Sequence, residues 1–259
     1  MTTRELPAGE RVKSADRALT VLDYVGEHHS VTFGQILTDL DLPRSSAHGL
    51  LRTLVAGGWL EIDALSRCYT LGLRTWQLGQ RYLGHRDLAQ LAKPYMDELA
   101  LELGETVQLA RLDGIENVYI AISEGPRPMR LASSVGMRLH AHGTGIGKAL
   151  LSQLDAVEVR RRLSGVVLPS FTDRTVTDLD ELTGLIDQAR ANGFALDDGE
   201  YLVGCRCVAV PMNVHGADGG LVAAMSVTAP VFRCDETWPE RALVTLQAGA
   251  ARIRERLSG

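Results

Sequence analysis

The first third of the chain carries three short helical patterns in succession, and this order restricts the possible folds more than any other feature. In each pattern, apolar residues recur at i, i+3 and i+4 spacing. Helix starts are marked by Ser14 as a cap, by a T-x-x-Q capping box of Thr32 and Gln35, and by Pro43 at a first helical turn. We therefore expect three small helices, of which the last ends at the glycine pair 57–58.

Two strand-like runs follow the third helix. "WLEID" at residues 59–63 and "CYTL" at 68–71 are joined by "ALSR", which is typical of a compact hairpin. Two helices across a short turn, followed by a hairpin, are the order of a winged helix-turn-helix. We predict such a DNA-binding domain over residues 10–72, after a flexible tail at 1–9 and before a linker helix at 73–85.

The face of the third helix that lies opposite its apolar residues is suited to contact DNA. The second helix of a helix-turn-helix enters the major groove, where Arg and His donate to base edges and Ser binds phosphate or base. The predicted DNA-binding residues are Arg44, Ser45, Ser46, His48, Gly49 and Arg52, with Arg67 in the wing and Lys13 and Arg17 in the first helix at the phosphate backbone. The net charge of −5 requires a local patch rather than bulk charge. A merely solvated helix face is the alternative.

The rest of the chain changes to strand periodicity. Strand-like runs are present at residues 106–112, 117–123, 129–135, 194–197, 205–214 and 220–229, with helical patterns starting near 145, 155 and 178 and a closing helix at the end. Because strands and helices do not alternate regularly, this order favours an α+β domain built on an antiparallel sheet. We assign it residues 86–259, so the chain as a whole is a two-domain α+β protein.

The stretch "HGTGIGKA" at residues 142–149 looks like a phosphate-binding loop but fails both common motifs. A Walker A motif needs Gly where His142 stands and Ser or Thr where Ala149 stands, and the dinucleotide motif needs a third Gly at Lys148. Glycines still let the backbone approach a ligand, and free N–H groups at a helix start attract anions. An anion anchor is therefore expected, with a glycine-rich helix entry packed on the sheet as the alternative.

Other chemistry receives little support from the sequence. The four cysteines lack the CxxC pairing of zinc sites, so neither a metal nor another cofactor is predicted. A polar N-terminus and the lack of an apolar run of about 18 residues predict a cytoplasmic protein without a membrane segment, with cysteines as thiols. A catalytic set of Cys207, His142 and Asp197 can be imagined, but no spacing places the three together, and no enzyme is predicted.

Several separated segments resemble the IclR family of transcriptional regulators. Similarity to its DNA-binding half is found in "VKSADRALTVLDYV", "LPRSSAHGLLRTLVAGGWLE" and "YTLGLRTWQLG", and to its effector-binding half in "HGTGIGKALL", "GFALDDGEYLVGCRCVAVPM" and "VAAMSVTAP". The resemblance implies a winged helix, a linker helix and a GAF-like effector-binding domain. It also implies homodimers or homotetramers, palindromic operator DNA and a small-molecule effector, and no enzymatic activity. One departure is Gly49, where the family commonly has Arg.

The effector-binding residues are predicted from this resemblance together with strand alternation, which puts Ser226 beside Thr228 and Cys205 beside Cys207 on one sheet face. The implied set is Gly145 and Ile146 as the anchor of an organic acid, then Asp197, Cys205, Cys207, Ser226 and Thr228, with Met129, Leu131 and Leu139 as an apolar wall. His142 is expected to orient the loop, near Glu200. The alternative function is a small-molecule-binding or catalytic α+β domain whose helical N-terminus only dimerises.

Overall fold

The computed structural model describes residues 12–81, 86–128, 131–214 and 221–258. The tail predicted at 1–9 and the predicted wall residue Met129 lie outside these residues. The chain divides into two compact units, one ending at Leu83 and one beginning at Gly84. In the described part, no helix combines the length and the apolar character needed to cross a membrane.

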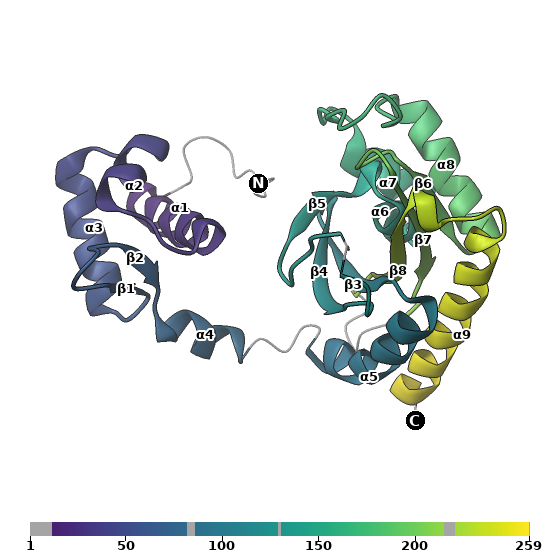
Figure 1. The fold of residues 1–259 in the computed structure, drawn as a ribbon. Coiled ribbons are helices and arrows are strands. Elements are labelled where there is room, and N and C mark those ends of the chain that lie inside the picture. Colours follow the sequence, from purple (N-terminus) through teal and green to yellow (C-terminus); the bar gives the residue numbers. More distant parts are fainter. Residues whose placement is uncertain (1–11, 82–85, 129–130, 215–220, 259) are drawn as a thin grey trace. The chain divides into compact units, whose positions relative to one another are not determined.

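The N-terminal unit is a small helical domain with a two-stranded wing (Figure 1). Its elements are α1 (Lys13–His28), α2 (Phe33–Asp39), α3 (Arg44–Ala56), β1 (Leu60–Ile62), β2 (Tyr69–Leu71) and α4 (Leu73–Gly79). The strands pair antiparallel, with Leu60 opposite Leu71. This is the predicted winged helix-turn-helix, and α4 lies within the segment predicted as a linker helix.

The helix starts of this unit agree only in part with the sequence. The capping box is confirmed, because the Thr32 hydroxyl accepts from Gln35 N and Thr32 N donates to the Gln35 side chain. The cap at Ser14 is wrong: α1 begins at Lys13, and the carbonyl of Val12 accepts from Asp16 N at 3.0 Å. A buried apolar cluster that includes Val21, Val25, Ile36, Leu51 and Leu60 holds α1, α2, α3 and the wing together.

The C-terminal unit contains a six-stranded antiparallel sheet in the order β5-β4-β3-β8-β7-β6. The strands are β3 (Thr106–Asp113), β4 (Glu116–Ser123), β5 (Arg138–His140), β6 (Ala195–Asp198), β7 (Cys205–Pro211) and β8 (Ala223–Pro230). Its helices are α5 (Arg86–Leu103), α6 (Gly145–Leu151), α7 (Ala156–Leu163), α8 (Leu179–Asn192) and α9 (Trp238–Ser258), with short 3-10 turns at Ala141–Gly143 and Val231–Arg233. The predicted α+β class is confirmed.

One predicted strand is wrong. Residues 131–135 of the run at 129–135 form a loop and the start of a turn, and the strand comes later, at Arg138–His140. Gly136, at φ 89°, completes the turn that redirects the chain into β5, which then pairs with β4. None of residues 131–135 is buried, and Val135 is 65% exposed.

In the C-terminal unit, helices lie on both faces of the sheet (Figure 1), and each face has its own cluster of buried apolar residues. Helices α5 and α9 pack side by side on one face, where Met96 and Leu246 meet Leu109 and Met225 of the sheet. Helix α6 lies against the opposite face, where its residues Ile146 and Leu150 join a second cluster. Every residue of α6 is buried, which places the start of this helix inside the protein.

Candidate functional site

The polar face of α3 is exposed along the whole helix. Ala47, Leu51 and Leu54 are buried, as the apolar spacing predicts, while the side opposite is accessible. The exposed members are the predicted Arg44, Ser45, Ser46, His48, Gly49 and Arg52, together with Arg67 in the wing and Lys13 at the start of α1; Arg17 is half-buried. In the N-terminal unit the fold therefore leaves every predicted base-contacting side chain accessible.

Phe33, the first residue of α2, joins two of these side chains. The Arg44 guanidinium carbon lies 5.6 Å from the centre of the Phe33 ring, and the His48 ring packs edge-on against it with centroids 5.7 Å apart. A cation over an aromatic face contributes about 0.5–1 kcal/mol at an exposed site. Phe33 was not predicted from the sequence, where its position directly after the Thr32 cap was the available signal.

Gly49 has no packing reason to be glycine. A Cβ atom at this position would meet no heavy atom within 4 Å, and the residue lies inside α3. Gly72 is the opposite case, because a Cβ there would lie 2.2 Å from the carbonyl oxygen of Gly58. The wing thus depends on its glycine at 72, whereas α3 accepts a side chain at 49.

In the C-terminal unit, the Thr144 side chain caps the start of α6, but not every amide of the first turn has a partner within the helix. The Thr144 hydroxyl accepts from Gly147 N at 3.1 Å and donates to Asn117 Oδ1 at 2.9 Å, and Lys148 N donates to the Thr144 carbonyl. The first amides of a helix have no partner within the helix. Gly145 and Ile146 therefore present two buried N–H groups that α6 itself does not use.

Gly145 lies directly against two other predicted residues. A Cβ at Gly145 would come within 3.2 Å of Cys207 Sγ and 3.4 Å of Asp197 Cβ. Gly147 instead serves tight packing, since a Cβ there would lie 2.1 Å from the Ala141 carbonyl oxygen. Both glycines thus lie in close packing: Gly147 against the turn before α6, and Gly145 against Cys207 of β7 and Asp197 of β6, so the packing alternative stays open at Gly145.

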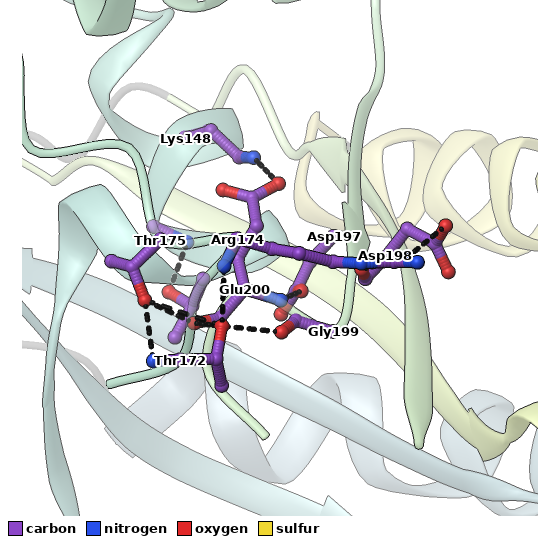
Figure 2. Close-up of polar contacts among 10 residues, drawn as sticks. Lys148, Thr172, Arg174, Thr175, Asp197, Asp198, Gly199 and Glu200 are labelled. Carbon is purple, nitrogen blue, oxygen red and sulfur yellow. Dashed lines mark hydrogen bonds and ion pairs between the residues drawn. The ribbon is translucent and has the colours of Figure 1, made fainter. Parts of the chain in front are cut away.

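Asp197 lies in an environment that disfavours its charge. Burial raises the pKa of the Asp197 carboxyl to about 6, although Glu200 N donates to it at 2.7 Å and Lys148 is near. The neighbouring Glu200 carboxylate pairs with Lys148 at 2.5 Å, both side chains being almost entirely buried (Figure 2). The charges around the anchor are therefore one ion pair and one carboxyl that readily accepts a proton.

The sheet face below α6 carries the other predicted polar residues. Ser226 and Thr228 of β8 both donate to Gln108 Oε1 of β3, at 3.1 and 3.5 Å. Cys207 is paired with Thr228 across β7 and β8. Burial raises the pKa of the Cys207 thiol to about 12, and hydrogen bonds with Thr228 and Ser226 oppose that rise. Gln108 was not predicted.

The remaining predicted residues lie at the margins. Cys205 is half-buried on the same strand face as Cys207, and burial raises the pKa of its thiol. Leu139 is buried in the same apolar cluster as Ile146, while Leu131 is half-buried in the loop before β5 and is not a member of that cluster.

A segment that sequence analysis did not consider closes over the turn after β6. Thr172 and Thr175 donate to the Glu200 carbonyl at 3.1 and 2.6 Å, and Arg174 binds Asp198 (Figure 2). Phe171 lies against Gly143, where a Cβ would be 2.9 Å from its ring. This segment fixes the turn that carries Glu200 and directly follows β6, the strand of Asp197.

Among the described residues, no hydrogen bond joins Cys207, His142 and Asp197 into the imagined catalytic set. His142 Nε2 is hydrogen-bonded to the Pro169 carbonyl at 2.9 Å, and its ring packs near Phe171. A nucleophilic cysteine needs a lowered pKa and a base within hydrogen-bond reach, whereas the pKa of Cys207 is raised. His142 instead connects the 3-10 turn before α6 to the segment containing Phe171, which is the orienting role that the sequence predicted for it.

Comparisons with known proteins agree with this architecture. Residues 14–64 match the IclR helix-turn-helix domain, and residues 80–255 match the family described as bacterial transcriptional regulator IclR C-terminal. The HTH-type transcriptional regulator XynR of Escherichia coli (strain K12) is 34% identical over 226 residues, which are 87% of this chain and 89% of XynR.

Solved structures are similar over almost the whole chain. A putative transcriptional regulator from Rhodococcus sp. RHA1 has a TM-score of 0.79 at 30% identity and covers 96% of this chain and 99% of its own. An IclR homolog from Microbacterium hydrocarbonoxydans, in complex with 4-hydroxybenzoate, has a TM-score of 0.80 at 27% identity, covering 95% of this chain and 99% of its own. The chain therefore belongs to the IclR family of bacterial transcriptional regulators, with an N-terminal helix-turn-helix domain and a C-terminal effector-binding domain.

Proposed function

We propose that α3 and the wing bind an operator, and that a small organic acid held at the start of α6 alters this binding. On the DNA side, Arg44, His48 and Arg52 contact base edges, because they lie on the accessible face of the helix that enters the major groove. Ser45, Ser46, Arg67, Lys13 and Arg17 contact phosphates. The protein acts in the cytoplasm as a homodimer or homotetramer, since a palindromic operator requires a two-fold symmetric reader.

The observation that carries the effector proposal is the pair of buried amides at Gly145 and Ile146. Two N–H groups at a helix start, without a partner inside the helix, are suited to bind a carboxylate. Cys207 and Asp197 lie against Gly145, and Thr228 is opposite Cys207 across β7 and β8. These residues and Ser226 would supply hydrogen-bonding groups for the rest of the acid, with Cys205 at one side and Leu131 and Leu139 as apolar contacts. The relative that binds 4-hydroxybenzoate supports an acid as effector.

The same chemistry favours sensing over catalysis. Burial raises the pKa of the Cys207 thiol, and His142 Nε2 is hydrogen-bonded to the Pro169 carbonyl; both features favour binding of an acid over nucleophilic attack on it. An acid changes operator affinity only if it binds the DNA-competent and incompetent arrangements unequally.

Two sets of variants test the proposal with an operator selected from random DNA. Arg44→Ala and Arg52→Ala should each weaken operator binding about 5- to 150-fold, as expected for the loss of a base contact, while the acid still raises the melting temperature. Ser226→Ala should bind the operator normally and respond less to the acid. Operator affinity unchanged by either Arg substitution would exclude α3 as the reading helix, and an unchanged acid response would remove Ser226 from the site.

A further inference from the structure

Gln108 is a buried polar side chain, and the proposed function explains only some of its hydrogen-bonding capacity. It lies in the middle of β3, between Ser226 of β8 and Ile122 of β4, and its exposed fraction is 0%. It shares a sheet face with Ala110, which packs under α6, whereas Leu109 faces α5 and α9. Gln108 therefore lies on the effector side of the sheet.

Only one of the two polar atoms of the Gln108 side-chain amide is hydrogen-bonded. Its Oε1 accepts from Ser226 and Thr228, while its Nε2 is buried and has no hydrogen-bond partner among the described residues. Turning the amide over would exchange the two atoms and leave the oxygen unpaired instead. Thr106, two residues earlier on the same face, also has a buried hydroxyl without a partner among those residues. An unpaired buried polar atom costs about 1–3 kcal/mol, so a ligand that pairs with it gains affinity.

The sheet fixes how far Gln108 lies from the acid anchor. Gly145 contacts Cys207 on β7, and β8 separates β7 from β3. Because neighbouring strands are about 4.8 Å apart, the strand that carries Gln108 is roughly 10 Å from the strand under the anchor. Cys207 is opposite Thr228, which is opposite Thr106, so Gln108 also lies two residues, about 7 Å, along β3, and its Cα is about 12 Å from that of Cys207. Side chains extend into this interval, so a second polar atom on the order of 5–10 Å from the bound carboxylate would reach the Gln108 amide.

From this placement we infer that Gln108 is a specificity-determining residue, which selects acids with a second oxygen at the end opposite the carboxylate. The inference rests on the proposed acid site and deepens it: the effector is a hydroxy acid or dicarboxylic acid with a body of ring size or of about five carbons, rather than a short monocarboxylic acid. The carboxylate binds the amides of Gly145 and Ile146, the body lies over Ser226 and Thr228, and the far oxygen pairs with Gln108.

Two matched pairs of acids measure this selectivity directly. Benzoate and 4-hydroxybenzoate differ by one hydroxyl, and pentanoate and glutarate differ by one carboxylate at the far end. Affinity is measured by calorimetry and by thermal shift on the full chain. The wild-type protein should prefer the oxygen-bearing member of at least one pair by about tenfold, the effect of one well-formed hydrogen bond.

Variants at Gln108 assign the preference to this side chain. Gln108→Met should remove the preference by lowering affinity for the oxygen-bearing acid alone. Gln108→Glu retains oxygen acceptors for Ser226 and Thr228, so it serves as a second variant if Gln108→Met does not fold. Its negative charge should exclude glutarate. The control is Gln153→Met: the Gln153 amide hydrogen-bonds Ala149, Asn213 and Ala223, so the variant should retain the preference.

The possible failures are distinct. The role of Gln108 would be overturned if the acids bind wild type without any preference within either pair, or if the preference survives in Gln108→Met. Neither result would contradict the proposed acid site. If none of the four acids binds or stabilises the wild-type protein, the acid site of the proposed function fails, and this inference fails with it.

Discussion

Lys148 and Glu200, 52 residues apart in sequence, form an ion pair of 2.5 Å in which only 4% and 14% of the side chains are exposed. The pair joins α6, whose start carries the proposed anchor amides, to the turn after β6, where Glu200 N donates to Asp197 (Figure 2). The structure thus ties together the two segments between which the acid is proposed to bind.

Removing one partner of this pair should be more harmful than removing both. Lys148→Met leaves a buried carboxylate without its cation and should lower the free energy of unfolding by about 3–5 kcal/mol. The double variant Lys148→Met/Glu200→Gln should recover much of that loss. Urea denaturation of the wild type, both single variants and the double variant checks this, and a loss in the double variant equal to the sum of the two single losses would mean that the pair has no coupling.

Asp197 should make stability depend on pH. Its folded-state pKa, about 6, lies above the ordinary value near 3.8, so the folded state binds the proton more tightly than the unfolded state. The stabilisation from this proton is complete below pH 4 and lost as the pH rises through 6. Over that interval the contribution falls by about 3 kcal/mol.

Asp197→Asn isolates the effect, since the amide oxygen still accepts from Glu200 N. Above pH 7 the variant should be more stable than wild type, and the difference between the two stability profiles should shrink toward pH 4. A difference that is constant with pH would show that Asp197 titrates alike in both states.

Gly49 can be replaced without a steric penalty. Gly49→Ala should stabilise the N-terminal unit by about 1 kcal/mol, because glycine inside a helix is less favourable than alanine by that amount and the position is open. Gly49→Arg should add a cation on the DNA-facing side and steepen the logarithmic salt dependence of operator binding by about 0.9. Anisotropy titrations at several salt concentrations measure the slope, with Gly49→Ala as the uncharged control; equal slopes would place residue 49 away from phosphate.

Phe33 should influence operator binding through its neighbours. Phe33→Leu keeps an apolar side chain but removes the ring that contacts Arg44 and His48, so we expect about 2- to 5-fold weaker operator binding. The effect should vanish in an Arg44→Ala/His48→Ala background, whose own affinity is the reference. An undiminished effect in that background would mean that Phe33 acts on folding or on DNA directly.

The sequence predicted those features that local chemistry determines. The capping box at Thr32 is confirmed because its hydrogen bonds span only three residues. The alternation of β8 is also confirmed: Ala223, Met225 and Val227 face α5 and α9, and Ala224 faces α6. The strand predicted at 129–135 is wrong over its described residues, 131–135. The segment that pairs with β4 is Arg138–His140, and pairing between strands depends on the tertiary structure.

The residues that were missed depend on contacts between distant segments. Gln108 lies in a segment whose sequence indicates only an ordinary β-strand. Its hydrogen-bond partners, Ser226 and Thr228, are more than 100 residues away in the sequence. Phe33 has the appearance of an ordinary core residue until the helix start at Arg44 is placed beside it. The contacts of Thr172, Arg174 and Thr175 with the turn after β6 likewise arise only from the fold.

An acid bound at the start of α6 is proposed to change operator affinity, and this coupling can be measured directly. The most direct measurement is the operator dissociation constant, determined by fluorescence anisotropy, as 4-hydroxybenzoate and glutarate are titrated into wild type and Ser226→Ala. In wild type, one of the acids should change the dissociation constant by about 5- to 150-fold, and the Ser226→Ala curve should move to higher acid concentration. Acids that bind the wild-type protein but leave its operator dissociation constant unchanged would contradict the account.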